Sequence, residues 1–109
     1  MDFNTYQQKA MRTLKDHPDF HKHIQMAVLG LNGESGEVAD IIKKHLYHGH
    51  DFDKEAFKKE LGDVLWYLST CASAIDTDLN EIAQLNIEKL ERRYPNGFNH
   101  QDSIHRKDY

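Results

Sequence analysis

Apolar residues recur every three or four positions in four segments of the chain, and this helical period most constrains the fold. The segments cover about 2–15, 21–46, 54–76 and 79–94. The third is the most regular, and its apolar face consists of Phe57, Leu61, Val64, Leu65, Leu68, Ala72 and Ile75. Because the connections are short and no alternating strand pattern occurs, we predict an all-α fold, a compact four-helix bundle.

Polar residues are placed where these helices should begin. Asp51 or Asp53 is expected to cap the helix that starts near residue 54, since a carboxylate there can accept a backbone N–H. Asp78 and Glu81 have the spacing of a capping box for the last helix. Trp66 falls opposite the main apolar face of its helix, so we expect either the first helix or a second subunit to cover it.

Length and charge set the class of protein. A chain of 109 residues is expected to be one domain, which we place at 1–98, with a polar, irregular tail at 99–109. The net charge of −4 without a basic patch argues against binding of nucleic acid.

No apolar run is long enough for a membrane span. A single cysteine, Cys71, is typical of a reducing compartment, so we expect a cytoplasmic protein.

Two pairs of carboxylates stand out, and each pair has i,i+3 spacing. They are Glu34 with Glu37 and, further along, Glu60 with Asp63. On a helix the two acids of a pair share one face. Two such helices facing each other would bring four oxygen ligands together, and oxygen-only clusters suit Mg²⁺ or Mn²⁺. The sequence therefore predicts a metal site of these four residues.

The alternative is that these acids are ordinary solvated surface residues, as most glutamates are. Solvated acids on helices are often paired with a lysine or arginine four positions later. Here those positions are held instead by Val38, Ile41, Val64 and Tyr67. Both pairs also border the apolar faces, where unpaired charge is costly. The pattern therefore favours the metal site.

Glycines accompany the acids at Gly30, Gly33, Gly36 and Gly62. Inside a helix each glycine costs about 1 kcal/mol relative to alanine. Close approach of a neighbouring helix or a ligand would explain them. The alternative is a break in the second helix near 30–36.

The last helix carries Asn86, Lys89 and Arg93 at i, i+3 and i+7, so they share one face. Lysine and arginine can hold phosphate oxygens, and asparagine can pair with a base or sugar. The alternative is that the cations only complement the helix dipole. Next to a metal site they favour recognition of a triphosphate.

Three blocks of sequence, in this order, resemble the MazG-like nucleotide pyrophosphohydrolases of the all-α NTP pyrophosphatase superfamily. They are GESGEVAD at 33–40, ELGDVLWYL at 60–68 and NIEKLERRYPNGF at 86–98. The family signature is E-x-x-E, a spacer and E-x-x-D, and it is complete in this chain. The resemblance covers about residues 25–98.

The resemblance implies a Mg²⁺-dependent enzyme, with Mn²⁺ as a substitute, that cleaves an NTP or dNTP to the monophosphate and pyrophosphate. It implies a homodimer or homotetramer. It also implies that the metal ligands are Glu34, Glu37, Glu60 and Asp63. The substrate contacts that it implies are Tyr67, Asn86, Lys89 and Arg93.

In such a mechanism a metal-bound water is expected to attack in line at the α-phosphorus. Glu37 is the preferred general base and Glu34 the alternative, because the sequence does not separate them. Contacts to the base are expected from Tyr6, Gln7 and Gln8 in the first helix. Two rival functions stay open, a helical interaction module without catalysis and a nucleotide sensor.

Overall fold

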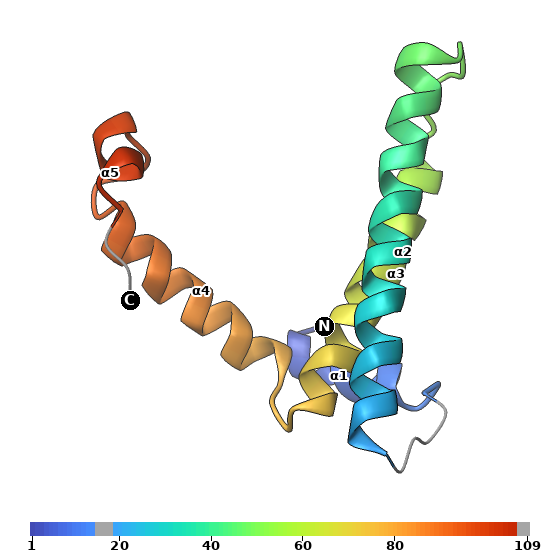
Figure 1. Ribbon diagram of the computed structural model, residues 1–109, viewed down its shortest axis with the longest axis horizontal. Helices are drawn as coiled ribbons and strands as arrows, with labels where there is room; N and C mark the ends of the chain where they lie inside the picture. Colours follow the sequence, from blue (N-terminus) through green and yellow to red (C-terminus); the bar gives the residue numbers. More distant parts are fainter. Residues whose placement is uncertain (15–18, 107–109) are drawn as a thin grey trace.

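The computed structural model describes residues 1–14 and 19–106, and these form five helices and no strand (Figure 1). The all-α prediction is therefore confirmed for the part of the chain that is described. No helix among these residues is both long enough and apolar enough to cross a membrane. The helices are α1 (Phe3–Met11), α2 (Phe20–Tyr47), α3 (Lys54–Ala74), α4 (Leu79–Arg93) and α5 (His100–Ile104).

Aspartates cap the starts of α3 and α4. Asp53, rather than Asp51, caps α3 and accepts a hydrogen bond from the backbone N–H of Ala56 at 3.0 Å. Asp78 accepts from the N–H of Glu81 at 2.7 Å, as predicted. The Glu81 carboxylate itself accepts from the Thr77 hydroxyl. These caps satisfy N–H groups that have no partner within the helix.

The tail was expected to be irregular, and this is wrong for residues 100–104, which form α5. Asn99 caps this short helix, because its side-chain oxygen accepts from the N–H of Asp102 at 2.7 Å. The apolar residues of the tail are too few to show a helical period, so the sequence pattern gave no sign of it.

The two long helices α2 and α3 lie side by side and run in opposite directions (Figure 1). Helix α1 crosses one end of this pair and packs against α3 and α4. Trp66 of α3 is held there, since its indole N–H donates to Ala10 O at 3.2 Å and to Thr13 Oγ1 at 2.9 Å. The first helix therefore covers Trp66, which is the first of the two predicted alternatives.

Helix α4 leaves this end of the α2–α3 pair at a wide angle, so the molecule has two arms (Figure 1). The radius of gyration is 17.1 Å, whereas a compact domain of this length has about 13 Å. The four main helices that the sequence predicts are present, but within one chain α4 does not close them into a compact bundle. Much of the apolar face of α4 is therefore left exposed.

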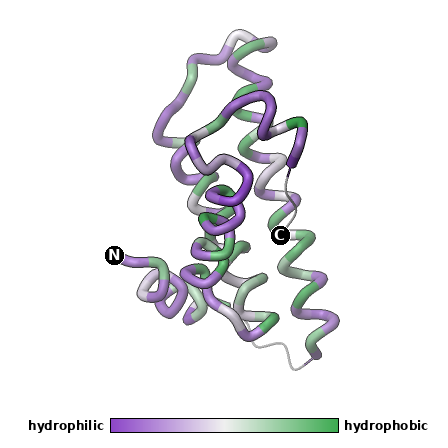
Figure 2. Tube along the Cα trace, turned by 90° about the vertical axis from the view of Figure 1, so that its left-hand side faces the viewer, coloured by the Kyte–Doolittle hydropathy of each residue, from purple (hydrophilic) through white to green (hydrophobic). Residues whose placement is uncertain are grey.

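The same openness is seen in the exposed surface. The accessible area is 8267 Å², about 2,000 Å² more than the roughly 6,300 Å² expected for a folded monomer of this mass. Figure 2 shows apolar residues along the length of the helices rather than in one enclosed centre. Several of them on α4 are exposed, among them Ile82, Leu85, Ile87 and Leu90.

Candidate metal centre

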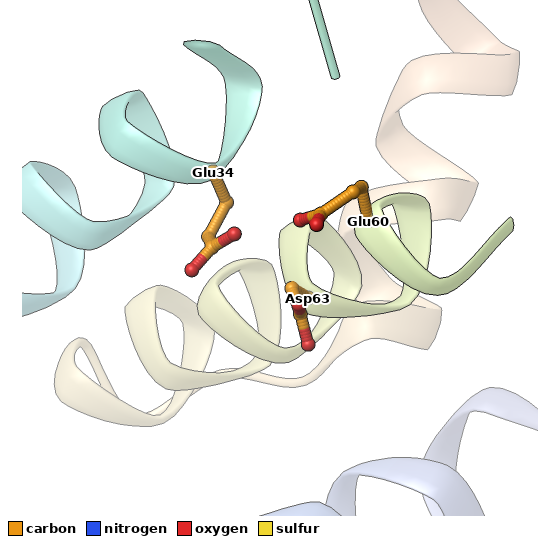
Figure 3. A group of neighbouring side chains, drawn as sticks. All are labelled: Glu34, Glu60 and Asp63. Atoms are coloured by element: carbon orange, nitrogen blue, oxygen red, sulfur yellow. The ribbon is translucent and has the colours of Figure 1, made fainter. Parts of the chain in front are cut away.

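Three carboxylates from two helices converge between α2 and α3. They belong to Glu34 of α2 and to Glu60 and Asp63 of α3 (Figure 3). One oxygen from each lies within 4.8 Å of the others. The i,i+3 spacing places Glu60 and Asp63 on the same face of α3, and the neighbouring helix presents Glu34 to that face. We call these three residues the acidic cluster.

Glu37, the fourth predicted ligand, is exposed and lies outside the acidic cluster. It is one turn beyond Glu34 on α2, and its charge contributes to raising the pKa of Glu34. The structure thus brings three of the four predicted ligands together and leaves Glu37 beside them.

Negative charge in the acidic cluster is not paired with a cation in the described part of the chain. Partial burial raises the pKa of Glu34, and the charge of Asp63 and the adjacent Glu60 carboxyl raise it further. Within the described residues no lysine, arginine or histidine forms an ion pair with the cluster. The basic side chains nearby on α2 are engaged elsewhere, since Lys43 and Lys44 both pair with Asp40.

This donor set fits a divalent cation. All three groups offer hard carboxylate oxygens, which Mg²⁺ and Mn²⁺ prefer. Oxygen ligands of one Mg²⁺ ion, each about 2.1 Å from it, lie at most about 4.2 Å apart. The separation in the acidic cluster, at most 4.8 Å, is therefore within reach of ligation after small rotations of the side chains.

Helix α2 runs without interruption through its glycines, so the alternative of a break near 30–36 is wrong. Close approach by another helix explains Gly30, because a Cβ there would lie 2.0 Å from Cε1 of Tyr67. It does not explain Gly33, Gly36 and Gly62, where an added Cβ would meet nothing within 4 Å. The glycines stand out in the sequence, but their spacing does not indicate that Gly30 faces Tyr67.

Two tyrosines border the acidic cluster. Tyr67 lies one turn beyond Asp63 on the same face of α3, where the sequence analysis expected a substrate contact. Partial burial raises the pKa of the Tyr6 phenol on α1, and the charge of Asp63 raises it further. Burial is the larger of the two causes.

Of the other residues expected to contact a base, Gln7 has a structural role. Its buried amide donates to Ser73 Oγ and Thr77 O, and its oxygen accepts from the N–H of Leu79. With these partners Gln7 joins α1 to the α3–α4 connection, whereas Gln8 beside it is exposed.

The predicted phosphate-binding residues stand on the other arm. Asn86 and Lys89 line a cleft of about 570 Å³ formed by α1, α3 and α4, and Arg93 ends α4. Because α4 leads away from α2 and α3, one chain does not bring these residues to the acidic cluster (Figure 1). Arg92 also lines the cleft, although it is not among the residues predicted to contact the substrate.

Comparisons with known proteins identify the family of this chain. Residues 22–98 match the family model described as "MazG nucleotide pyrophosphohydrolase domain". The chain is similar to the "Gene 37 protein" of Mycobacterium phage L5, with 33% identity over 78 residues that cover 68% of each chain. No solved structure gave a significant match. The matched region contains the acidic cluster and α4, and the chain belongs to the MazG nucleotide pyrophosphohydrolase family.

Proposed function

We propose that this protein is a Mg²⁺-dependent nucleoside triphosphate pyrophosphohydrolase that converts an NTP or dNTP to the monophosphate and pyrophosphate. The observation that carries the proposal is the convergence of Glu34, Glu60 and Asp63 from two helices, with no ion-paired cation among the residues that the structure describes. Family membership supports the reaction class, and the acidic cluster supports a site for the metal that such a reaction uses.

The carboxylates of Glu34, Glu60 and Asp63 would hold Mg²⁺, or Mn²⁺ in its place. When bound, the ion lowers the pKa of a coordinated water and neutralises negative charge on the phosphates. The position of Glu37 favours a role other than metal ligation, since this residue is exposed, one turn from Glu34 and outside the acidic cluster. We assign Glu37 as the base that takes the proton of the attacking water, with Glu34 as the alternative.

Substrate phosphates need cationic partners, and Lys89 and Arg93 are assigned to them, with Asn86 and Tyr67 at the nucleoside. Lys89 and Arg93 stand on α4, whereas the acids and Tyr67 stand on the α2–α3 arm. The proposed site is therefore assembled from two copies, each supplying α4 to the acids of the other.

A homodimer or homotetramer also accounts for the open shape. The excess exposed area of about 2,000 Å² per chain is in the range that obligate dimers bury. The cleft between the arms has apolar walls that include Leu65, Leu68 and Ile82, and a second copy would remove them from water. We place the enzyme in the cytoplasm, acting on free nucleotides rather than on nucleic acid or a membrane.

The test is a panel of NTPs and dNTPs incubated with Mg²⁺, with pyrophosphate release as the measurement. Glu60→Gln should abolish release and leave the helical circular dichroism unchanged. Glu55→Gln is the matched control, because Glu55 lies on the same helix but is exposed and paired with Lys58. Nucleotide binding without release would indicate a sensor, and neither binding nor release would indicate an interaction module.

A further inference from the structure

The ring of Tyr67 occupies the space that a side chain at position 30 would need. A Cβ on Gly30 would lie 2.0 Å from Cε1, 2.3 Å from Cζ and 2.5 Å from Cδ1 of Tyr67. Carbon atoms in favourable contact are about 3.5 to 4.0 Å apart. Any residue larger than glycine at position 30 therefore requires that the ring, or one of the two helices, move.

This requirement is specific to one position. Gly33 and Gly36 lie on the same helix and Gly62 on the facing helix, yet an added Cβ at any of them would meet no atom within 4 Å. Among the glycines within α2 and α3, Gly30 has a steric reason for its lack of a side chain, and that reason is the Tyr67 ring.

The contact lies next to the acidic cluster on both helices. Gly30 is one turn before Glu34 on α2, and Tyr67 is one turn after Asp63 on α3. The distance between α2 and α3 at the Gly30–Tyr67 contact therefore helps to set the distance between the carboxylates, which lie a single helical turn of about 5.4 Å away. If the helices were pushed apart there, Glu34 would move away from Asp63 and Glu60.

Movement of the Tyr67 ring is itself restricted. The ring contacts the indole of Trp66 edge to face, with centroids 4.9 Å apart and planes at 83°. The indole is in turn held by hydrogen bonds to Ala10 of α1 and to Thr13 in the turn that follows α1. A side chain at position 30 would have to push the Tyr67 ring against the Trp66 indole. A shift of α2 away from α3 is the alternative way to make room.

We infer that Gly30 is a positioning residue for the acidic cluster: by lacking a side chain it seats Tyr67 against α2 and holds Glu34 at ligating distance from Glu60 and Asp63. The inference rests on the proposed function, in that the cluster is taken to bind a divalent ion. It assigns to Gly30 no contact with substrate or metal.

The experiment measures Mn²⁺ affinity by electron paramagnetic resonance, which needs no turnover. Gly30→Ala should raise the Kd for Mn²⁺ about tenfold, the usual size of an effect on residues that orient ligands. Gly33→Ala adds the same methyl group on the same helix where it meets nothing, and its Kd should stay within about twofold of wild type.

Comparing Gly30→Ala in the wild type and in Tyr67→Ala shows whether the added methyl group acts through the Tyr67 ring or in some other way. Tyr67→Ala alone should weaken Mn²⁺ binding, and adding Gly30→Ala to it should change the Kd no further, since the ring that clashes is gone. This pair also decides the matter if Gly30→Ala alone does not fold. An equal loss of affinity from Gly30→Ala with or without the ring would overturn the inference, as would an unchanged Kd in Gly30→Ala or Tyr67→Ala alone.

Failure of the proposed function gives a different result. If wild type itself neither binds Mn²⁺ nor releases pyrophosphate, the metal site is wrong and the role of Gly30 is wrong with it. If wild type binds Mn²⁺ and Gly30→Ala binds equally well, only the role of Gly30 is wrong.

Discussion

The backbone N–H of Leu79, at the start of α4, donates a hydrogen bond of 2.8 Å to the side-chain oxygen of Gln7 in α1. Both residues are buried, with exposed fractions of 6% for Leu79 and 8% for Gln7. The amide nitrogen of Gln7 donates to Ser73 Oγ and to Thr77 O, so one side chain contacts the end of α3, the connection and the start of α4. This contact fixes the point from which the second arm departs.

Gln7→Ala is therefore expected to lower the free energy of unfolding by about 1–3 kcal/mol, because it leaves the buried Leu79 N–H without its partner. Gln8→Ala is the control, since Gln8 is the next residue and exposed, and it should change stability by less than about 0.5 kcal/mol. Urea unfolding followed by circular dichroism measures both. Equal stability of the two variants would show that the Gln7 contacts contribute nothing.

Local features of this fold could be predicted from the sequence because local physics determines them. The period of Leu61, Leu65 and Leu68 marks α3, and the carboxylates of Asp53 and Asp78 mark helix starts, where they accept backbone N–H groups. The i,i+3 spacing of Glu60 and Asp63 was enough to place both on one face, and the acidic cluster contains both.

Features that depend on the packing of distant segments could not be predicted in this way. A helical period says which face of α4 is apolar but not what covers it, so the wide departure of α4 was missed. The spacing of Glu34 and Glu37 gives them a common helix face, but the register of α2 against α3 decides which of them joins the cluster. The same register pairs Gly30 with Tyr67, residues far apart in sequence.

The geometry of the acidic cluster predicts which of the four acids contribute most to Mn²⁺ affinity. Glu34→Gln, Glu60→Gln and Asp63→Asn should each weaken Mn²⁺ binding at least about tenfold, because each removes a converging oxygen ligand. Glu37→Gln should leave Mn²⁺ affinity near that of wild type and still abolish pyrophosphate release, as expected for the base. A loss of Mn²⁺ affinity in Glu37→Gln equal to that of the other three would make Glu37 a fourth ligand instead.

The raised pKa of Glu34 predicts how stability depends on pH in the absence of divalent ions. Its folded pKa lies above the ordinary value of 4.5, so the folded protein keeps a proton that the unfolded chain has already lost. The contribution of Glu34 to stability is therefore complete below that ordinary value and is lost as the pH rises through the folded pKa.

Wild type should accordingly lose stability relative to Glu34→Gln as the pH is raised from 4.5 toward neutrality, and Mg²⁺ should restore it by balancing the charge. Asp2 and Asp40 do not interfere, since their lowered pKa values act below their ordinary value of 3.8. Urea unfolding at a series of pH values, with EDTA or with Mg²⁺, measures the difference. Parallel curves for the two proteins in EDTA would contradict the prediction.

The proposed assembly from two copies predicts that a charge introduced in the cleft prevents assembly and leaves metal binding intact. Leu85 lines the cleft on α4 and is 57% exposed in one chain, so Leu85→Glu would bury a carboxylate against the second copy. Sedimentation velocity should then show a monomer that binds Mn²⁺ normally, because one chain holds the whole acidic cluster, but releases no pyrophosphate. Ile104→Glu, on α5 and not among the cleft-lining residues, should stay assembled and active. A wild-type protein that is monomeric and active at micromolar concentration would contradict the proposed assembly.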